Sequence, residues 1–311
     1  MSWSQSCYSN GEPSRQQNSL FLQMDEHPRV AFETFVEQKI QAALSARIRT
    51  LTTVFERNAE TAVRGVGNSW TRLHYGGDFD LTVAPANGTS LSLVFVQSRD
   101  GNTEAADPSE FGAGATDTHL IYEGLSRVAA DAVLVGARTV HPKAFFSVWH
   151  PELVALRESL GLSRHPAQVV VSKRGHVDLD SLLFNVPEVP VFLIGGEECF
   201  LRHAAALRVR PWIRPVPLDG VDLTSSLERL RLEDGIARIS AVGGRSTATR
   251  LVDDGLAQDL YLTTGPRSGG TIDTAWYAGA ARPRLTIKTT KEWGDAGSRV
   301  VFEHILIRKE R

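Results

Sequence analysis

The sequence is poor in cysteine, in net charge and in long apolar segments, and each shortage excludes a class of protein. Only 2 of the 311 residues are cysteines, Cys7 and Cys199, too few for the disulfide framework of a secreted domain. The 34 basic and 36 acidic residues leave a formal net charge of -2, which excludes a broad basic surface for nucleic acid. No apolar run is long enough to cross a membrane, and the polar first 25 residues do not resemble a secretory signal. We therefore expect a cytoplasmic protein that binds neither nucleic acid nor membrane.

What the sequence does contain divides into three parts. Residues 1–28 are rich in Ser, Gln and Asn and predict a flexible arm. Residues 29–87 begin with apolar side chains at three- and four-residue steps from Val30 to Phe55, which predict one amphipathic helix within a helical extension. Residues 88–311 predict the main domain.

From residue 88 onward, apolar runs typical of strands alternate with helical patterns. The predicted strands cover residues 92–96, 132–135, 168–171, 189–194, 213–217, 238–242, 260–263, 285–291 and 300–308. The predicted helices cover residues 117–128, 151–161, 197–207, 222–233 and 246–254. This alternation is typical of an α/β fold with a mainly parallel sheet and helices on both faces. The last two strands predict an antiparallel pair, which makes the sheet mixed.

Ligands of such sheets bind beyond the carboxyl ends of the strands, and these ends are rich in glycine here. Gly136 and Thr139 follow one predicted strand, and Gly243-Gly244 lies between another strand and a helix that begins with Ser246 and Thr247. A diglycine there lets the backbone approach a ligand closely, while the helix end offers N–H groups to a diphosphate. The same pair is also typical of a tight turn with an ordinary helix cap, so both interpretations stay open.

Two cations and a hydroxyl gather at the end of another predicted strand. Ser172, Lys173 and Arg174 follow one another there, and such a group suits a phosphate monoester, for example the 2′-phosphate of NADPH. A solvated turn is the alternative interpretation.

Asp100 is the candidate catalytic residue. It lies in the turn Ser98–Gly101 that closes the first core strand. A carboxylate in that place can bind a polar substrate or relay a proton, although Asp-Gly is also a common turn signal.

Several other chemistries lack their motifs. The two cysteines and nine histidines show no metal-ligand spacing, so we expect no metal. The G-x-S-x-G motif of serine hydrolases and the H-x-E with P-C-x-x-C motif of zinc deaminases are both missing. We therefore expect no deaminase activity.

The motifs occur in an order that resembles one known family. The matching stretches are Phe95–Gly101, Arg127–Val140, Val169–Ser172, Gly243-Gly244, Asp253–Leu260, and Pro266 with Gly269-Gly270. Over about residues 88–308 the chain resembles the riboflavin-biosynthesis reductase domain, which is the C-terminal half of bacterial bifunctional pyrimidine deaminase–reductases.

The resemblance implies a dihydrofolate-reductase-like fold, a homodimer and an NADPH-dependent reductase of a small molecule. In that family, hydride passes from the nicotinamide to the ribose C1′ of a phosphoribosylamino-pyrimidine. The resemblance places Gly136 and Thr139 beside the nicotinamide and diphosphate, Ser172 near the 2′-phosphate, and Gly243-Gly244 around the diphosphate.

The substrate side departs from the family pattern. Ser98, Asp117 and Lys143 are our candidate substrate-binding residues, but Val242 replaces the usual glutamate before the diglycine, and residues 141–147 lack the expected aspartate. The substrate is therefore open among the riboflavin precursor, a folate or pterin, and another carbonyl or imine compound. The alternative hypothesis is a catalytically altered nucleotide-binding or interaction protein on the same fold.

Overall fold

A computed structural model describes the chain apart from residues 1–14, 58–62, 87, 219–221, 296 and 310–311. Its centre is a ten-stranded sheet. From one edge to the other the strands are β1 (Thr52–Glu56), β11 (Arg284–Trp293), β12 (Val300–Arg308), β10 (Asp259–Thr264), β4 (Ser90–Gln97), β9 (Arg238–Val242), β5 (Ala132–Gly136), β6 (Ala167–Ser172), β7 (Val191–Gly195) and β8 (Ile213–Pro217). The strands from β10 to β8 are parallel, whereas β12, β11 and β1 pair antiparallel. The predicted mixed, mainly parallel sheet is confirmed.

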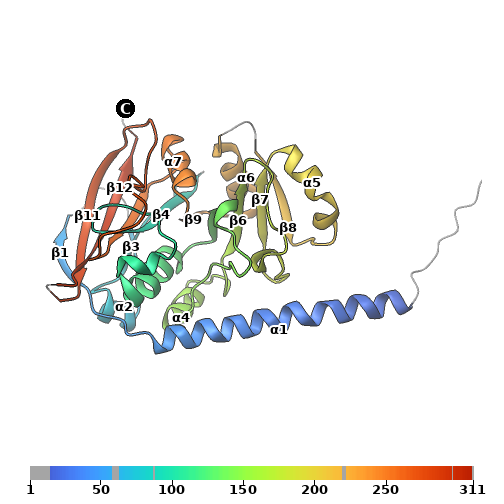
Figure 1. Cartoon of the computed structure of the whole chain (residues 1–311), viewed down its shortest axis with the longest axis horizontal. Coiled ribbons are helices and arrows are strands. Elements are labelled where there is room, and N and C mark those ends of the chain that lie inside the picture. The colour runs from blue at the N-terminus through green and yellow to red at the C-terminus, as the bar shows by residue number, and fades with distance from the viewer. Residues whose placement is uncertain (1–14, 58–62, 87, 219–221, 296, 310–311) are drawn as a thin grey trace, which may run out of the picture.

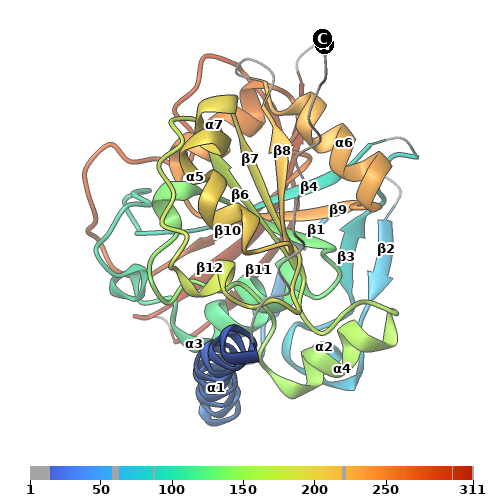
Figure 2. The ribbon, with the colours of Figure 1, turned by 90° about the vertical axis from the view of Figure 1, so that its right-hand side faces the viewer.

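Helices cover both faces of the sheet, as predicted. One face packs against α1 (Arg15–Ser45), α2 (Ser69–His74), the π-helix η2 (Asp117–Leu125), α4 (Pro151–Ser159) and α5 (Glu197–Arg208). The other face packs against α6 (Thr224–Asp234) and α7 (Arg245–Asp253). Figure 2 looks along α1, which lies at the bottom of the view with α2 and α4 to its right. The smaller elements are β2 (Val63–Val66) and β3 (Phe79–Thr82), which pair with each other, and η1 (Pro108–Phe111), α3 (Gly114–Thr116), η3 (Ala137–Thr139) and η4 (Leu182–Phe184). Among the helices that the structure describes, none has the length and apolarity needed to span a membrane.

The N-terminal segment differs from its prediction. The helix predicted to reach Phe55 is wrong in its second half, because α1 ends at Ser45 and residues 52–56 form the edge strand β1 against β11. The apolar periodicity continues past the helix, but its last two members lie outside the core, since Val54 and Phe55 are 52% and 42% exposed. Of the predicted arm, residues 1–14 lie outside the described residues and residues 15–28 are helical, forming the first part of α1, which projects beyond the body of the molecule (Figure 1).

An aromatic cluster fixes the second half of α1 to the domain. Phe32 lies with its ring centroid 4.8 Å from that of Phe145 and 5.6 Å from that of His165. Phe35 meets Trp149 edge-on at 5.7 Å. Edge-to-face pairs of this kind add to the free energy gained from apolar burial, so these rings provide the main specific contact between α1 and the main domain.

The partly buried histidine of this cluster, His165, makes stability depend on pH. Burial lowers the pKa of His165 to about 3, and neighbouring arginines add to the effect. The unfolded ring binds its proton near pH 6.5 while the folded ring does not, so stability is full above pH 6.5 and falls as the pH is lowered. We expect the contribution of His165 alone to lower the free energy of unfolding by roughly 2–4 kcal/mol between pH 7 and pH 4.

Urea unfolding at a series of pH values measures this effect. The variant His165→Phe should reduce the slope of the free energy of unfolding against pH by the equivalent of about one proton. The control variant His141→Phe, at an exposed position, should not change this slope. Burial also lowers the pKa of His150, to about 4. A smaller dependence of stability on pH should therefore remain in both variants. An unchanged slope in His165→Phe would contradict the interpretation.

Candidate active site

The diglycine turn between β9 and α7 requires glycine at both positions. Gly243 and Gly244 have φ angles of 71° and 77°, in the left-handed region that L-residues rarely adopt. A Cβ atom on Gly243 would lie 2.9 Å from Cγ2 of Thr139. The turn therefore brings its bare backbone against η3 and the start of α7, where the first N–H groups of a helix have no partner within the helix.

The ends of β5 and β9 meet at this turn. A Cβ atom on Gly136 would lie 2.6 Å from Oγ1 of Thr247, and Arg138 donates a hydrogen bond of 2.8 Å to Oγ of Ser246. The structure thus brings together all six of the predicted residues at these two strand ends: Gly136, Thr139, Gly243, Gly244, Ser246 and Thr247.

Sequence reasoning missed Arg138. Its guanidinium lies beside the N-terminus of α7 and adds a positive charge to a place that already favours anions. Its position, between Gly136 and Thr139 in a strand-end turn, was the available signal.

At the end of the neighbouring strand β6, the two predicted cations are accessible to a ligand, but the predicted hydroxyl is not. Ser172 is buried, and its Oγ donates to the carbonyl oxygen of His176, 3.2 Å away, within its own turn. The predicted phosphate contact through this hydroxyl is therefore not available in this arrangement. Lys173 and Arg174 are exposed on the turn, and neither forms an ion pair within the part of the chain that the structure describes.

Asp100 holds a loop in place. Its carboxylate is exposed and accepts hydrogen bonds from Oγ of Ser268 at 3.0 Å and from the N–H of Gly269 at 3.2 Å. Ser98 is fully buried, and its Oγ accepts a bond from the N–H of Asn102 at 3.2 Å. These two predicted site residues shape the turn after β4 and connect it to the loop after β10.

Asp117 is the buried carboxyl at this edge of the sheet. It is 9% exposed at the start of the π-helix, a helix type that is frequent at functional sites. Burial raises the pKa of Asp117 to about 6, and the hydroxyl of Thr263 opposes this to a smaller extent. Thr263 itself is fully buried, and its hydroxyl meets no hydrogen-bond partner of ordinary geometry among the described residues. Asp117 and Thr263 therefore form a buried polar pair at the end of β10.

Sheet register relates Asp117 to the diglycine turn. Thr263 of β10 pairs with Val96 of β4, and Val242 of β9 pairs with Val94. Because β10 and β9 flank β4, Thr263 and the diglycine lie nearly level and about 10 Å apart. Thr263 was missed by sequence reasoning, although it is a polar residue at the end of an apolar strand.

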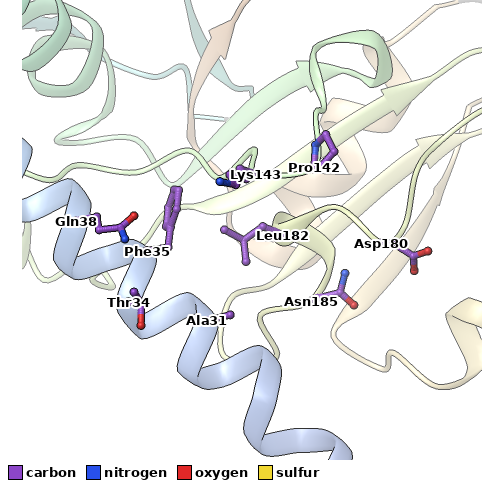
Figure 3. Close-up of a pocket in the computed structure, with 9 residues that line it drawn as sticks. All are labelled: Ala31, Thr34, Phe35, Gln38, Pro142, Lys143, Asp180, Leu182 and Asn185. Atoms are coloured by element: carbon purple, nitrogen blue, oxygen red, sulfur yellow. The ribbon is translucent and has the colours of Figure 1, made fainter.

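Lys143 lies elsewhere. Together with residues of α1 it lines a cavity of about 580 Å³ between that helix and the segments around residues 142 and 182 (Figure 3). The cavity is lined by Ala31, Thr34, Phe35, Gln38, Pro142, Lys143, Asp180, Leu182 and Asn185. None of the strand-end residues around Gly243 belongs to this lining, so Lys143 is not grouped with the other predicted substrate residues.

Two further observations bear on what the edge can bind. No group of three or more His, Cys, Asp or Glu side chains suitable for a metal ion occurs in the described part of the chain. The bare backbone of Gly243-Gly244, the N-terminus of α7 and the guanidinium of Arg138 fit a diphosphate, whose negative charge they can balance. The exposed cations at the end of β6 fit a further phosphate two strands away from β9.

Comparison with known proteins supplies the family. The family of the RibD C-terminal domain matches residues 89–298. The chain belongs to this family. The predicted resemblance to the riboflavin-biosynthesis reductase domain is thereby confirmed. The RibD C-terminal match begins just before β4, so α1 and β1–β3 lie outside it.

Solved structures support the same fold. A pyrimidine reductase-like protein from Corynebacterium diphtheriae is 19% identical, with a TM-score of 0.54 over 71% of this chain and 93% of that chain. RibD from Acinetobacter baumannii is 17% identical, with a TM-score of 0.51 over 72% of this chain and 59% of that chain. At these identities the likeness concerns the fold of the RibD C-terminal domain alone. No curated protein sequence matches the chain.

Proposed function

We propose that this protein is an NADPH-dependent reductase that transfers hydride to a small pyrimidine- or pterin-type substrate. The observation that carries the proposal is the meeting of the β5 and β9 ends around Gly243-Gly244, with the buried Asp117 two strands away at the same edge. This arrangement offers one surface for a dinucleotide and an ionisable group beside it.

Each part of the edge has a role in this proposal. The diglycine turn and Arg138 bind the diphosphate, and Lys173 with Arg174 binds the 2′-phosphate. When bound, the nicotinamide supplies the hydride. Asp117, neutral below about pH 6, donates a proton from its carboxyl to the substrate atom that gains negative charge. Thr263 offers its hydroxyl to the same substrate.

Coenzyme preference tests the cationic turn. We expect NADPH to bind at least 10-fold more tightly than NADH, because charge-assisted bonds to the 2′-phosphate are made only by NADPH. Lys173→Ala and Arg174→Ala should each weaken NADPH binding about 10-fold and leave NADH unchanged. The control is Arg208→Ala, an exposed cation at the far end of α5. Equal affinity of the wild-type protein for the two coenzymes, measured by nicotinamide fluorescence, would exclude the 2′-phosphate assignment.

Turnover tests the substrate. The protein is incubated with NADPH and either a phosphoribosylamino-pyrimidine or a dihydropterin, and the loss of nicotinamide absorbance is followed. Oxidation that depends on one of the two compounds identifies the class. Coenzyme binding without oxidation by either compound, or by a wider panel of carbonyl and imine compounds, would overturn the reductase proposal.

One observation favours the alternative of a nucleotide-binding or interaction protein without turnover. The segment where the family pattern brings an acidic residue is packed into the core here, with Ala144, Phe145, Phe146 and Ser147 all buried. A partner of this alternative protein would be sought through α1, whose first half projects from the body (Figure 1). Assembly into a homodimer stays a prediction under both proposals.

A further inference from the structure

The N-terminal segment reaches the residues around Asp117. After α1 ends at Ser45, the chain crosses to β1, and the backbone N–H of Arg49 donates a hydrogen bond of 2.9 Å to Oγ1 of Thr116. Thr116 directly precedes Asp117 in the chain. Two residues later, the N–H of Leu51 donates to the carbonyl oxygen of His74 at 2.7 Å. The crossing segment is thus fastened at two points and holds Arg49 beside the start of the π-helix.

Among the residues that the structure describes, the side chain of Arg49 forms only a weak ion pair. It is 46% exposed, and the ion pair that it forms is a 3.7 Å contact with Asp295, whose side chain is 90% exposed. An exposed pair at this distance contributes little and exchanges readily for another anion. A guanidinium held by its backbone and weakly paired at its tip is suited to binding the planar oxygens of a phosphate or carboxylate.

Sheet register places this guanidinium at the same edge as Asp117. Val301 of β12 pairs with Thr264 of β10, next to Thr263. The turn between β11 and β12, which carries Asp295, therefore extends beyond the carboxyl end of β10. Arg49 lies between this turn and Thr116, on the side of Asp117 away from the diglycine turn.

We propose that Arg49 binds an anionic group of the substrate, a phosphate or a carboxylate, at the outer end of the site that contains Asp117. The inference rests on the proposed function for the location of the substrate. It gives the substrate two ends: a polar ring that reaches Asp117 and Thr263, and an anion that reaches Arg49. It also gives the N-terminal extension, which lies outside the family match, a direct part in specificity.

Binding of charged and uncharged forms of the same compound tests the proposal. One pair is a phosphoribosylamino-pyrimidine and its dephosphorylated form, and the other is a pteridine with and without a glutamate tail. Affinities are measured by calorimetry with the full chain and saturating NADP⁺, which has no hydride to donate, so that binding is measured without turnover. The variants are Arg49→Met and Arg49→Lys.

Arg57 provides a matched control. Arg57→Met removes the same charge from the same N-terminal segment, but Arg57 lies at the other end of β1, at least about 13 Å further along the strand. We expect Arg49→Met to weaken binding of one anionic compound 10- to 100-fold and to leave its uncharged form unchanged. Arg49→Lys should restore part of the loss, and Arg57→Met should have no effect.

The outcomes separate this inference from the reductase proposal. If Arg49→Met selectively weakens the phosphorylated compound, the anion is a phosphate. If it selectively weakens the compound with the glutamate tail, the anion is a carboxylate. A loss shared equally by charged and uncharged forms, no loss in Arg49→Met, or a wild-type protein that does not distinguish the forms would overturn the role of Arg49. A selective loss in a protein that never oxidises NADPH would instead support Arg49 and overturn the reductase.

Discussion

Replacing Gly243 with aspartate is expected to weaken NADPH binding at least 100-fold and to abolish NADPH oxidation. The new Cβ atom would lie 2.9 Å from Cγ2 of Thr139, inside the contact distance of two carbon atoms. The carboxylate would then meet the N-terminus of α7 where we place the diphosphate, and would occupy and neutralise the anion site. Coenzyme fluorescence titration measures the loss.

The chain contains a close control for this variant. Gly235, at the end of α6, has the same φ of 71° as Gly243, but a Cβ atom there would meet nothing within 4 Å. Gly235→Asp therefore carries the same backbone strain, a cost of about 1 kcal/mol, without approaching the proposed site. We expect it to bind NADPH normally. Normal binding by Gly243→Asp, or an equal loss in both variants, would contradict the diphosphate assignment.

Replacing Asp117 with asparagine should lower activity and raise stability. Asparagine cannot donate the proton, so we expect kcat to fall by at least 100-fold. In the wild-type protein kcat/KM should fall above pH 6, where Asp117 loses its proton, and this decline should vanish in the variant. Asp100→Asn is the comparison, because the sequence predicts Asp100 as the proton donor. A large loss in Asp100→Asn with none in Asp117→Asn would reverse our assignment.

The stability effect has a definite sign. The pKa of Asp117 is raised from 3.8 to about 6 by burial, so between these values the folded protein binds a proton that the unfolded chain does not. Stability is therefore full below pH 3.8 and falls as the pH rises to 6. At pH 7 the ionised carboxylate costs up to about 3 kcal/mol, and Asp117→Asn should recover much of it. Urea unfolding at pH 4 and pH 7 checks this, because the gain should appear only at pH 7.

The main domain was largely predictable from the sequence. The inner strands of the parallel sheet are largely buried on both faces, so an apolar run such as Ala132–Val135 marks its own position. The glycines at strand ends were informative for a different reason. Gly243 has a positive φ, which glycine adopts readily and other residues rarely do, so the residue type itself indicates the turn.

Other features depend on contacts that no local pattern encodes. The apolar spacing up to Phe55 does not reveal that the helix ends at Ser45. The change from helix to strand depends on pairing with β11, more than 200 residues later in the chain. The sequence favours Asp100 as the catalytic acid and offers Asp117 only as a substrate-binding residue. Only the fold shows that Asp100 is exposed and tied to Ser268, whereas Asp117 is buried beside Thr263.

The edge strand β1 has a further consequence for the molecule as a whole. All five of its residues are exposed, so it contributes little to the hydrophobic core, yet it pairs with the backbone of β11 along one border of the sheet. Unpaired strand borders recruit other chains and lead to aggregation. A fragment that begins at the family match would expose the border of β11. The solubility of the protein therefore depends on a strand whose side chains contribute little to the core.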